Sequence, residues 1–436
     1  MKNHIVFIAF IILSSILSAQ KGKTYKSLEE AFKNPDSVFS LDIRNNDLTK
    51  LPKDIKKFKN LKYLSISNTQ LTELPKEIGK LSNLINLDLN MNQIKSLPKS
   101  IGKLKNLKQI RFSNSKITGF PKSFGKLTNL ESIEISISDF AKFPTSIGKL
   151  KNLKSINIST SQLTSLPASI GDLENLEKLM LGGNKITVLP ESIGKLTNLK
   201  ILFLISNQLS SLPSSIENLS NLKKLSINSN QFKALPKSIG KLVKLRELDA
   251  GGNMLTVLPE YITSLTGLSS LDLSANRIKI LPDSFGNLSK LYTLNLYGNQ
   301  LETLPESFGN LSKLGELYLS GNKLSNLPET FGNLTNLSML YANKNQLKTL
   351  PDSFGKLTNL SFLNLSENQL TSLPDSIGEM TNLSNLEITS NQLTSLPKSI
   401  SKLSDLYSIS IEDNQLKREE MKKLMTLLPE CDWSFQ

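Results

Sequence analysis

The sequence contains very little cysteine and histidine. Cys431 is the only cysteine and His4 is the only histidine in 436 residues. A single cysteine cannot form an internal disulfide bond, and a single histidine cannot supply a histidine metal cluster. Nucleophilic pairs of the Ser-His or Cys-His kind also need a histidine close to the active site. We therefore expect no catalytic residues, no cofactor and no metal site.

Long hydrophobic segments are also scarce. The clearest one is the largely apolar run from Ile5 to Leu17, which follows Lys2 and precedes the small residues Ser18 and Ala19. A bilayer requires about 20 apolar residues, so this run is too short to be a membrane span. A basic start, an apolar middle and small residues at the end are typical of a cleaved secretory signal. We predict a signal peptide at 1–19 and a mature chain that is secreted, periplasmic or on the outer surface, without a transmembrane segment.

The dominant positive feature is a repeat of 23 residues. Prolines recur at this interval from Pro52 to Pro397, which is typical of a solenoid. Seventeen repeats fit, the first beginning at Val38 and the last at Leu406, and positions below are counted from these starts. Apolar residues at the fourth and sixth positions alternate with polar ones at the third, fifth and seventh, which is the period of a strand with one buried face. Each repeat should therefore add one short strand to a parallel sheet.

The rest of the repeat predicts how the chain returns to the next strand. An asparagine at the ninth position can satisfy backbone groups of a turn that lies inside the coil. The following Leu-Pro step fixes an extended conformation, and Ile or Phe followed by Gly indicates one tight helical turn. A wide strand side and a narrow return side make the stack curve. The polar strand faces should then line its concave surface.

These motifs resemble the leucine-rich repeat family, as in Leu268, Leu271, Leu273, Asn276 and Ile278. The L-P-x-x-I-G-x-L variant is similar to secreted repeat proteins of spirochaetes and related bacteria. The resemblance implies an α/β solenoid with the shape of a horseshoe or superhelix, a parallel concave β-sheet and a binding role without catalysis. Some repeats depart from the pattern and carry Ser or Thr in place of the ninth-position asparagine. We expect residues 110–165, where three of them lie, to be locally softer.

Short helices should cover the two ends of the repeat array, because terminal repeats would otherwise expose their core. Ser27 and Glu30 match a capping box before one such helix. Met421, Leu424, Met425 and Leu428 share one face of the other helix, which should cover the last repeat. We interpret Cys431 as packing of this cap rather than as a reactive thiol. The predicted organisation is a signal peptide at 1–19, an N-terminal cap helix at 20–37, repeats at 38–416 and a C-terminal cap helix and tail at 417–436.

The fifth strand position lies at the centre of the predicted concave face, and most repeats carry Ser, Asp or Asn there. Tyr318 and Tyr341 are exceptions 23 residues apart, so they should be neighbours on adjacent strands. Exposed aromatic patches often mark interfaces, although cross-strand aromatic pairs also stabilise a sheet. We predict a partner-binding patch of Tyr297, Tyr318, Met339, Tyr341 and Phe362, and a secondary patch of Met180, Phe203 and Ile205.

Positive charge is concentrated in the first half of the chain. Residues 1–218 hold 31 Lys and Arg against 17 Asp and Glu, whereas residues 219–436 hold 21 of each, which together give the net charge of +14. One row of lysines recurs at the twentieth position, on the predicted convex side: Lys57, Lys80, Lys103, Lys126 and Lys149. Such a row could bind an extended polyanion or could only keep the surface solvated. Nucleic acid is disfavoured because no aromatic residues are interleaved with these lysines.

The sequence therefore predicts a secreted, non-catalytic scaffold that binds a protein partner, such as a host or cell-surface protein, through its concave sheet. Two alternatives remain open. One is a glycan, polyanion or envelope binder that uses the basic convex face of the N-terminal half. The other is a structural component of the cell envelope.

Overall fold

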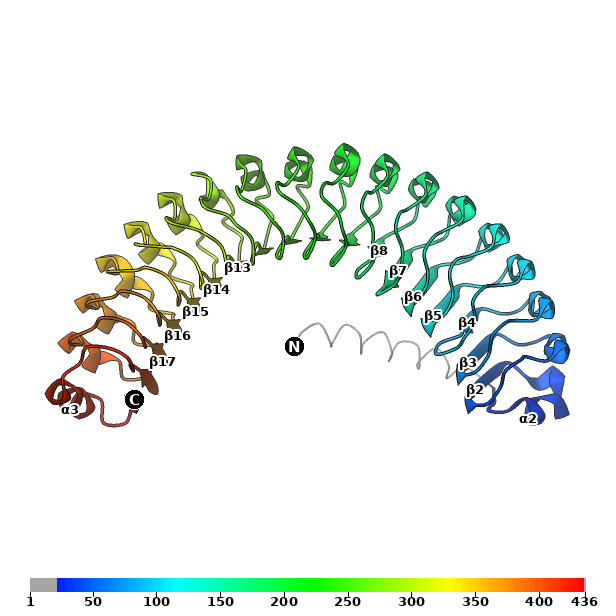
Figure 1. Cartoon of the computed structure of the whole chain (residues 1–436), viewed down its shortest axis with the longest axis horizontal. Helices are drawn as coiled ribbons and strands as arrows, with labels where there is room; N and C mark the ends of the chain where they lie inside the picture. Colours follow the sequence, from blue (N-terminus) through cyan, green and yellow to red (C-terminus); the bar gives the residue numbers. More distant parts are fainter. Residues whose placement is uncertain (1–21, 435–436) are drawn as a thin grey trace. The chain divides into compact units, whose positions relative to one another are not determined.

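The computed structural model describes residues 22–434, so the predicted signal peptide lies outside the described residues. The chain divides into two compact units, Met1–Leu176 and Glu177–Gln436, which we call unit 1 and unit 2. Both units have the same construction. One short strand from each repeat lies on the inner side, and one short 3-10 helix lies on the outer side (Figure 1).

In unit 1 consecutive strands pair in parallel, and equivalent positions of neighbouring repeats face each other, as in Leu64 opposite Leu87. The strands are β1 (Thr24–Tyr25), β2 (Ser40–Asn46), β3 (Tyr63–Thr69), β4 (Asn86–Asp88), β5 (Gln109–Ser115), β6 (Ser132–Ser138) and β7 (Ser155–Ser159). The helices are α2 (Leu28–Lys33), η2 (Pro35–Ser37), η3 (Lys53–Lys57), η4 (Lys76–Lys80), η5 (Lys99–Lys103), η6 (Lys122–Lys126), η7 (Thr145–Lys149) and η8 (Ala168–Asp172).

Unit 2 continues the same pattern of parallel pairing in register. Its strands are β8 (Lys178–Met180), β9 (Ile201–Phe203), β10 (Lys224–Ser226), β11 (Glu247–Asp249), β12 (Ser270–Asp272), β13 (Thr293–Asn295), β14 (Glu316–Tyr318), β15 (Met339–Tyr341), β16 (Phe362–Asn364), β17 (Asn385–Glu387), β18 (Ser408–Ser410) and β19 (Asp432–Ser434). Its helices are η9 (Glu191–Lys195), η10 (Ser214–Asn218), η11 (Lys237–Lys241), η12 (Glu260–Ser264), η13 (Phe285–Asn287), η14 (Glu306–Asn310), η15 (Glu329–Asn333), η16 (Asp352–Lys356), η17 (Asp375–Glu379), η18 (Lys398–Lys402) and α3 (Arg418–Leu427). The predicted solenoid with a parallel sheet and helical caps is confirmed.

The core lies between the strands and the 3-10 helices and consists of stacked apolar rows. The fourth and sixth positions, such as Leu317 and Leu319, are fully buried. In unit 2 four phenylalanines at the eighteenth position stack with ring centroids 5.9 to 6.1 Å apart, from Phe285 to Phe354. The glycine after each of them is needed because a Cβ on Gly309 would lie 2.2 Å from the carbonyl oxygen of Thr330. Neighbouring outer helices thus pack too closely for a side chain at that point.

The buried asparagine at the ninth position joins consecutive repeats in unit 2. The Asn276 amide donates hydrogen bonds to the carbonyls of Ala250, Leu273 and Ser274 at 3.0 to 3.1 Å. Its Oδ1 accepts a hydrogen bond from the N–H of Leu255 at 3.0 Å. One side chain therefore satisfies four backbone groups of two repeats, which confirms the turn role expected from the sequence.

Most strands of unit 1 are longer than the three-residue strands of unit 2. β3, β5 and β6 each span seven residues, and the strand pairing reaches the ninth position at Ser115 and Ser138. The longer pairing does not follow from the hydroxyls alone, because β2 also spans seven residues and has Asn46 at the ninth position. Ser138 and Ser161 are also joined to each other, with their hydroxyl oxygens 3.0 Å apart. Whether residues 110–165 are softer stays a prediction.

We predict that Asn276→Ser destabilises the protein by about 2 to 4 kcal/mol, because it leaves buried carbonyls without a donor. The measurement is guanidinium unfolding followed by circular dichroism. The matched control is Asn326→Ser, an exposed asparagine of the same unit, which should change stability by less than about 0.5 kcal/mol. Equal effects of the two substitutions would contradict the role of the buried amide.

The eighth position of the repeats adopts a left-handed backbone conformation that was not predicted from the sequence. Glycine is found there in some repeats, such as Gly298 with φ 66° and Gly321 with φ 69°. Others carry side chains, and Ile137 has φ 50° although it is β-branched. Branching at Cβ makes this region costly, at about 1 to 2 kcal/mol for each residue. Since Ile137 is 57% exposed, burial of its side chain offsets little of that cost.

Ile137→Asn should therefore raise the free energy of unfolding by about 1 kcal/mol, because Asn tolerates the left-handed region. Asn68 and Asn114 already occupy the same position in two other repeats of unit 1. Thermal and urea unfolding of Val188→Asn provide the comparison, since Val188 is equally exposed and lacks positive φ. A gain at both sites, or a loss at Ile137, would show that backbone strain is not the cause.

The N-terminal cap follows the sequence prediction in part. The Ser27 hydroxyl accepts a hydrogen bond from the Glu30 N–H at 3.2 Å at the start of α2. The side chain of Glu30 pairs with Lys23 instead of closing the predicted capping box. Phe32 stacks on Phe58 with ring centroids 4.8 Å apart, so the helix covers the first repeat.

The C-terminal cap corrects one detail of the prediction. Leu424 and Leu428 of the α3 region are buried, whereas Met425 is 51% exposed and does not cover the core. Met425 follows Leu424 by one residue, which rotates it about 100° away from the buried face. The chain then adds β19, which pairs in parallel with β18 and covers the last edge of the sheet. This strand was not predicted from the sequence because it lies outside the repeat spacing.

Candidate protein-interaction surface

The centre of the candidate surface is a stacked pair of tyrosines on the inner side of unit 2. Tyr318 ends β14 and Tyr341 ends β15, and the two residues face each other in the strand register. Their rings are nearly parallel, with centroids 5.2 Å apart and an interplanar angle of 11°. Both residues are half-buried. The predicted juxtaposition is confirmed.

Two further predicted residues extend this pair across the next strand. Phe362 begins β16, and its ring centroid lies 4.7 Å from that of Tyr341. Met339 faces Phe362 in the register and is 39% exposed. Three aromatic rings and one thioether therefore form a continuous apolar surface over β14, β15 and β16, which are neighbours on the inner side of the unit (Figure 1).

Tyr297 lies apart from this stack. It follows β13 at the seventh position and is 53% exposed. Within residues 22–434 no ring contact joins it to Tyr318; its ring edge instead lies near Gly321, where a Cβ would be 3.8 Å from Cε2. Tyr297 thus borders the stack and does not surround it as predicted. We call Tyr297, Tyr318, Met339, Tyr341 and Phe362 the aromatic surface.

The electrostatic environment of the tyrosine pair is acidic. Burial raises the pKa of the Tyr318 hydroxyl, and the adjacent Glu316 carboxylate raises it further. Tyr318 therefore stays protonated at neutral pH and can donate a hydrogen bond.

The stacking of the two tyrosine rings contributes about 0.5 to 1.5 kcal/mol to the stability of the sheet. An anchoring contact that buried one ring completely would contribute about 1.5 to 3 kcal/mol.

The secondary patch is also assembled, on β8 and β9. Met180 faces Phe203 in the register, and both are half-buried. Ile205 is 38% exposed and lies over Gly182, where a Cβ would be 2.7 Å from its Cγ2 atom. This patch is aliphatic at its edge and has a single aromatic ring.

The predicted lysine row lies on the outer side of unit 1, where each lysine is the last residue of a 3-10 helix. The row consists of Lys57, Lys80, Lys103, Lys126 and Lys149, and all are exposed. Only Lys57 forms an ion pair within the described chain, with Asp54 at 2.7 Å. The other four ammonium groups are available to an anion in solution.

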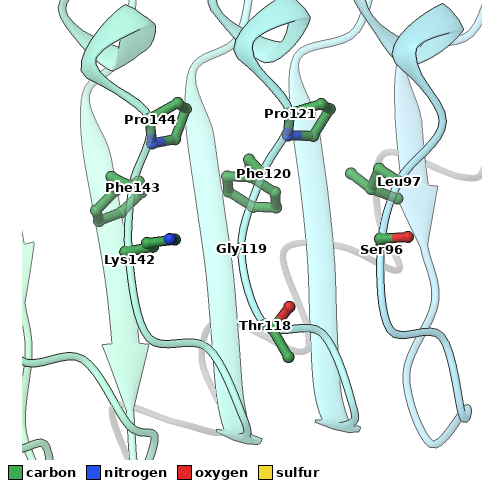
Figure 2. Close-up of a pocket in the computed structure, with 9 residues that line it drawn as sticks. All are labelled: Ser96, Leu97, Thr118, Gly119, Phe120, Pro121, Lys142, Phe143 and Pro144. Carbon is green, nitrogen blue, oxygen red and sulfur yellow. The ribbon is translucent and has the colours of Figure 1, made fainter.

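A shallow apolar hollow of about 450 Å³ on unit 1 was not predicted from the sequence. Figure 2 shows Phe120 and Phe143 side by side in it, each followed by the proline of its repeat. These are the repeats that carry Phe in place of Leu before the proline, which is the signal that could have revealed the hollow. Their rings pack edge to face with Phe140 at 5.0 and 5.1 Å, so most of their surface belongs to the core.

Cys431 does not have the properties of a nucleophile. The side chain is half-buried beside β19, and burial together with the Asp432 charge raises the pKa of its thiol to about 11. At neutral pH it is almost entirely protonated. This environment agrees with the interpretation of Cys431 as cap packing, although the residue is less buried than expected.

The rate of alkylation of Cys431 by iodoacetamide should increase about tenfold for each pH unit between pH 8 and pH 10, because the thiolate fraction grows in that range. In the urea-unfolded chain the same rate should level off near the ordinary thiol pKa of about 8.5. A folded protein whose labelling rate levels off below pH 9 would contradict the raised pKa.

Within residues 22–434 no three His, Cys, Asp or Glu side chains converge in a way that could hold a metal ion. The same described residues include no helix that is long and apolar enough to cross a membrane. The assembled surfaces are thus the aromatic surface, the smaller apolar patch of Met180, Phe203 and Ile205, the basic row and the shallow hollow. All four are surfaces that could bind a ligand without carrying out a reaction on it.

Comparison with known proteins identifies the family. The family model described as a leucine-rich repeat region matches residues 37–163, 144–251, 233–321, 257–341 and 316–431. A solved leucine-rich repeat protein of Leptospira interrogans is 35% identical, covers 95% of this chain and 100% of its own, and has a TM-score of 0.79. No curated protein matches the chain.

Receptors of plants are similar at lower identity. The plant peptide hormone receptor RGFR1, solved in complex with RGF2, is 26% identical over 93% of this chain and 76% of its own, with a TM-score of 0.69. The Arabidopsis receptor kinase HAESA, solved with the peptide hormone IDA and the co-receptor SERK1, is 26% identical over 95% of this chain and 72% of its own, with a TM-score of 0.70. The chain belongs to the leucine-rich repeat family and is of the bacterial, spirochaete type.

Proposed function

We propose that this protein is a secreted, non-catalytic scaffold that binds a protein partner, such as a host or cell-surface protein, through the aromatic surface of unit 2. The observation that carries the proposal is the stack of Tyr318 and Tyr341. Both rings stand on an inner sheet position where the fold requires no aromatic residue, since other repeats carry Ser, Asp or Asn there. Tyrosine is enriched among residues that dominate binding energy.

The comparisons support the same class of function. RGFR1 and HAESA share this architecture and were solved with peptide hormones bound. A scaffold of parallel repeats presents a long, rigid face, and rigid aromatic side chains lose little conformational entropy on binding. Export of the chain to the periplasm or the outer surface is part of the proposal and rests on the signal-like residues 1–19.

A second candidate is an anionic glycan bound by the outer lysine row of unit 1. Four exposed lysines without an ion pair, on four successive 3-10 helices, favour it. Binding through such a row depends on charge alone. It should therefore weaken steeply as salt rises and should not involve the tyrosines.

The double substitution Tyr318→Ser with Tyr341→Ser tests the main proposal. Two buried rings contribute about 3 to 6 kcal/mol, so affinity for the protein partner should fall at least about 100-fold. The mature chain is immobilised, proteins are captured from host surface and matrix extracts, and the affinity of each captured protein is then measured by surface plasmon resonance. Circular dichroism should show an intact fold, since Ser occupies the equivalent position in other repeats.

Two matched variants serve as controls in the same assay. Tyr407→Ser removes a 70% exposed tyrosine of unit 2 outside the aromatic surface and should leave affinity unchanged. The triple substitution Lys80→Gln, Lys103→Gln and Lys126→Gln should reduce only retention on a heparin column. If it abolished capture of the protein partner while the tyrosine variant bound normally, the second candidate would replace the first.

A further inference from the structure

The inner side of unit 2 carries acidic side chains and no basic ones from β11 to β18. We define the inward lanes as the third, fifth and seventh positions of each repeat, which point away from the core. In these strands the lanes contain no Lys or Arg, in a protein whose net charge is +14. Their acidic residues are Glu247, Asp249, Asp272, Glu316, Glu387 and Glu412.

Most of these carboxylates are held by neutral groups. Asp249 accepts a hydrogen bond from the Ser226 hydroxyl at 2.9 Å, and Asp272 accepts one from the Asn295 amide at 3.0 Å. Glu387 accepts a hydrogen bond from the amide of Asn364. Of the six lane acids, only Glu247 forms an ion pair within the described chain, with Lys224 at 2.7 Å. The other five carboxylates have no ion pair with a basic side chain of the described chain.

In unit 1, by contrast, two of the three inward-lane acids form ion pairs, and Asp88 is the one without an ion pair in the described chain. Asp42 is paired with Arg44 at 2.9 Å and with Lys26 at 2.7 Å. Glu134 is paired with Arg111 at 2.9 Å. The lanes can therefore hold an acid together with its counter-ion, whereas from β11 to β18 of unit 2 they contain no Lys or Arg.

A cation would stabilise the charged form of the half-buried carboxylates in the lanes of unit 2. Burial raises the pKa of Asp249 and that of Glu387, which means that the surroundings disfavour their charged forms. A cation placed beside them would restore the lost solvation of the charge. Basic residues near the lanes do not do this. Lys344 pairs with Glu367 at 3.4 Å, and Arg277 and Lys323 are exposed at the tenth position, beyond the inner turn.

The aromatic surface lies between these acids. Glu316 is on the same strand as Tyr318 and points to the same side, two residues earlier. Asp272 lies two strands before Tyr318, and Glu387 lies two strands after Tyr341. A guanidinium or ammonium group over the face of a tyrosine is attracted by the ring and would also lie close to Glu316. The surface thus combines an apolar platform with negative charge on both sides.

We propose that the partner of this surface is a basic protein segment, which places an Arg or Lys side chain over Tyr318 and Tyr341 and pairs its other cations with Asp272, Glu316 and Glu387. This inference rests on the proposed function and adds the chemistry of the partner. Arg fits best because its planar group stacks on rings and binds carboxylates in a bidentate manner. A neutral glycan could also stack on the rings, but it would leave the unpaired carboxylates without cations.

The spacing sets the length of the segment. Asp272 on β12 and Glu387 on β17 are separated by five strand steps, or about 24 Å at about 4.8 Å for each step. An extended peptide covers this distance with about seven residues, at about 3.4 Å per residue. A segment that crosses the strands is therefore long enough to reach both groups of acids.

The test uses the mature chain and three fluorescein-labelled peptides of nine residues, in which Ser alternates with Arg, Gln or Glu. Fluorescence anisotropy gives the affinity of each peptide, and maltohexaose serves as a neutral glycan competitor. We expect the Arg peptide to bind at least tenfold more tightly than the Gln peptide, and the Glu peptide not to bind. Raising salt from about 50 to 300 mM should weaken binding of the Arg peptide several-fold, because these charges are partly exposed.

Two triple variants separate the inward charges from charge in general. Asp272→Asn with Glu316→Gln and Glu387→Gln keeps the size and shape of the side chains and should lower affinity for the Arg peptide at least tenfold. The control, Glu329→Gln with Asp352→Asn and Asp375→Asn, removes the same charge from η15, η16 and η17 on the outer side of unit 2. It should bind within about twofold of the unmodified chain, as expected for exposed charges far from the ligand.

Four results would overturn the inference: no binding of the Arg peptide up to about 1 mM, equal binding of the Gln peptide, equal losses in the two triple variants, or displacement by maltohexaose. None of them would by itself remove the proposed function. A neutral or acidic protein that is captured by the unmodified chain and lost in the double tyrosine variant would keep the proposed function and exclude the basic partner.

Discussion

The structure depends on one constraint, which is that the chain returns to an equivalent place every 23 residues. In unit 2 the buried ninth-position asparagine enforces this return. The amide of Asn322 bonds to the carbonyl of Leu296 in the preceding repeat and of Leu319 in its own, both at 2.9 Å. Its Oδ1 accepts the N–H of Leu301 at 3.0 Å. A shift of register by one residue would break all of these bonds and would bury the polar lanes.

Because the register is fixed, residues that are 23 apart in the sequence become neighbours in space. The core positions are nearly invariant along the array, so variation is confined to the lanes and to the outer turns. A surface is consequently built by substituting one residue in each of several successive repeats. The stacked rings of Tyr318 and Tyr341 and the lysines that end η4 to η7 are two results of the same rule on opposite sides of a repeat.

This rule also explains what the sequence could predict. The period alone placed Tyr318 opposite Tyr341, because equal spacing implies equal position. Features that do not follow the period were missed. The left-handed backbone at Ile137 is hidden by a side chain atypical of that region, and β19 pairs with the sheet from outside the array. The period likewise gave the position of Tyr297 but not the direction of its ring, whose edge lies near Gly321.

Local charge matters more than net charge for a ligand on the inner side of unit 2. The chain as a whole has a charge of +14, which would slow the approach of a basic partner at long range. At physiological salt the screening length is about 8 Å, so most of that charge is not felt by a group bound in the lanes. The carboxylates of Asp272, Glu316 and Glu387 lie within the lanes themselves, and they act at contact distance. The same molecule can therefore attract a basic partner at the inner surface of unit 2 and repel it weakly at long range. The short-range attraction determines which partner stays bound.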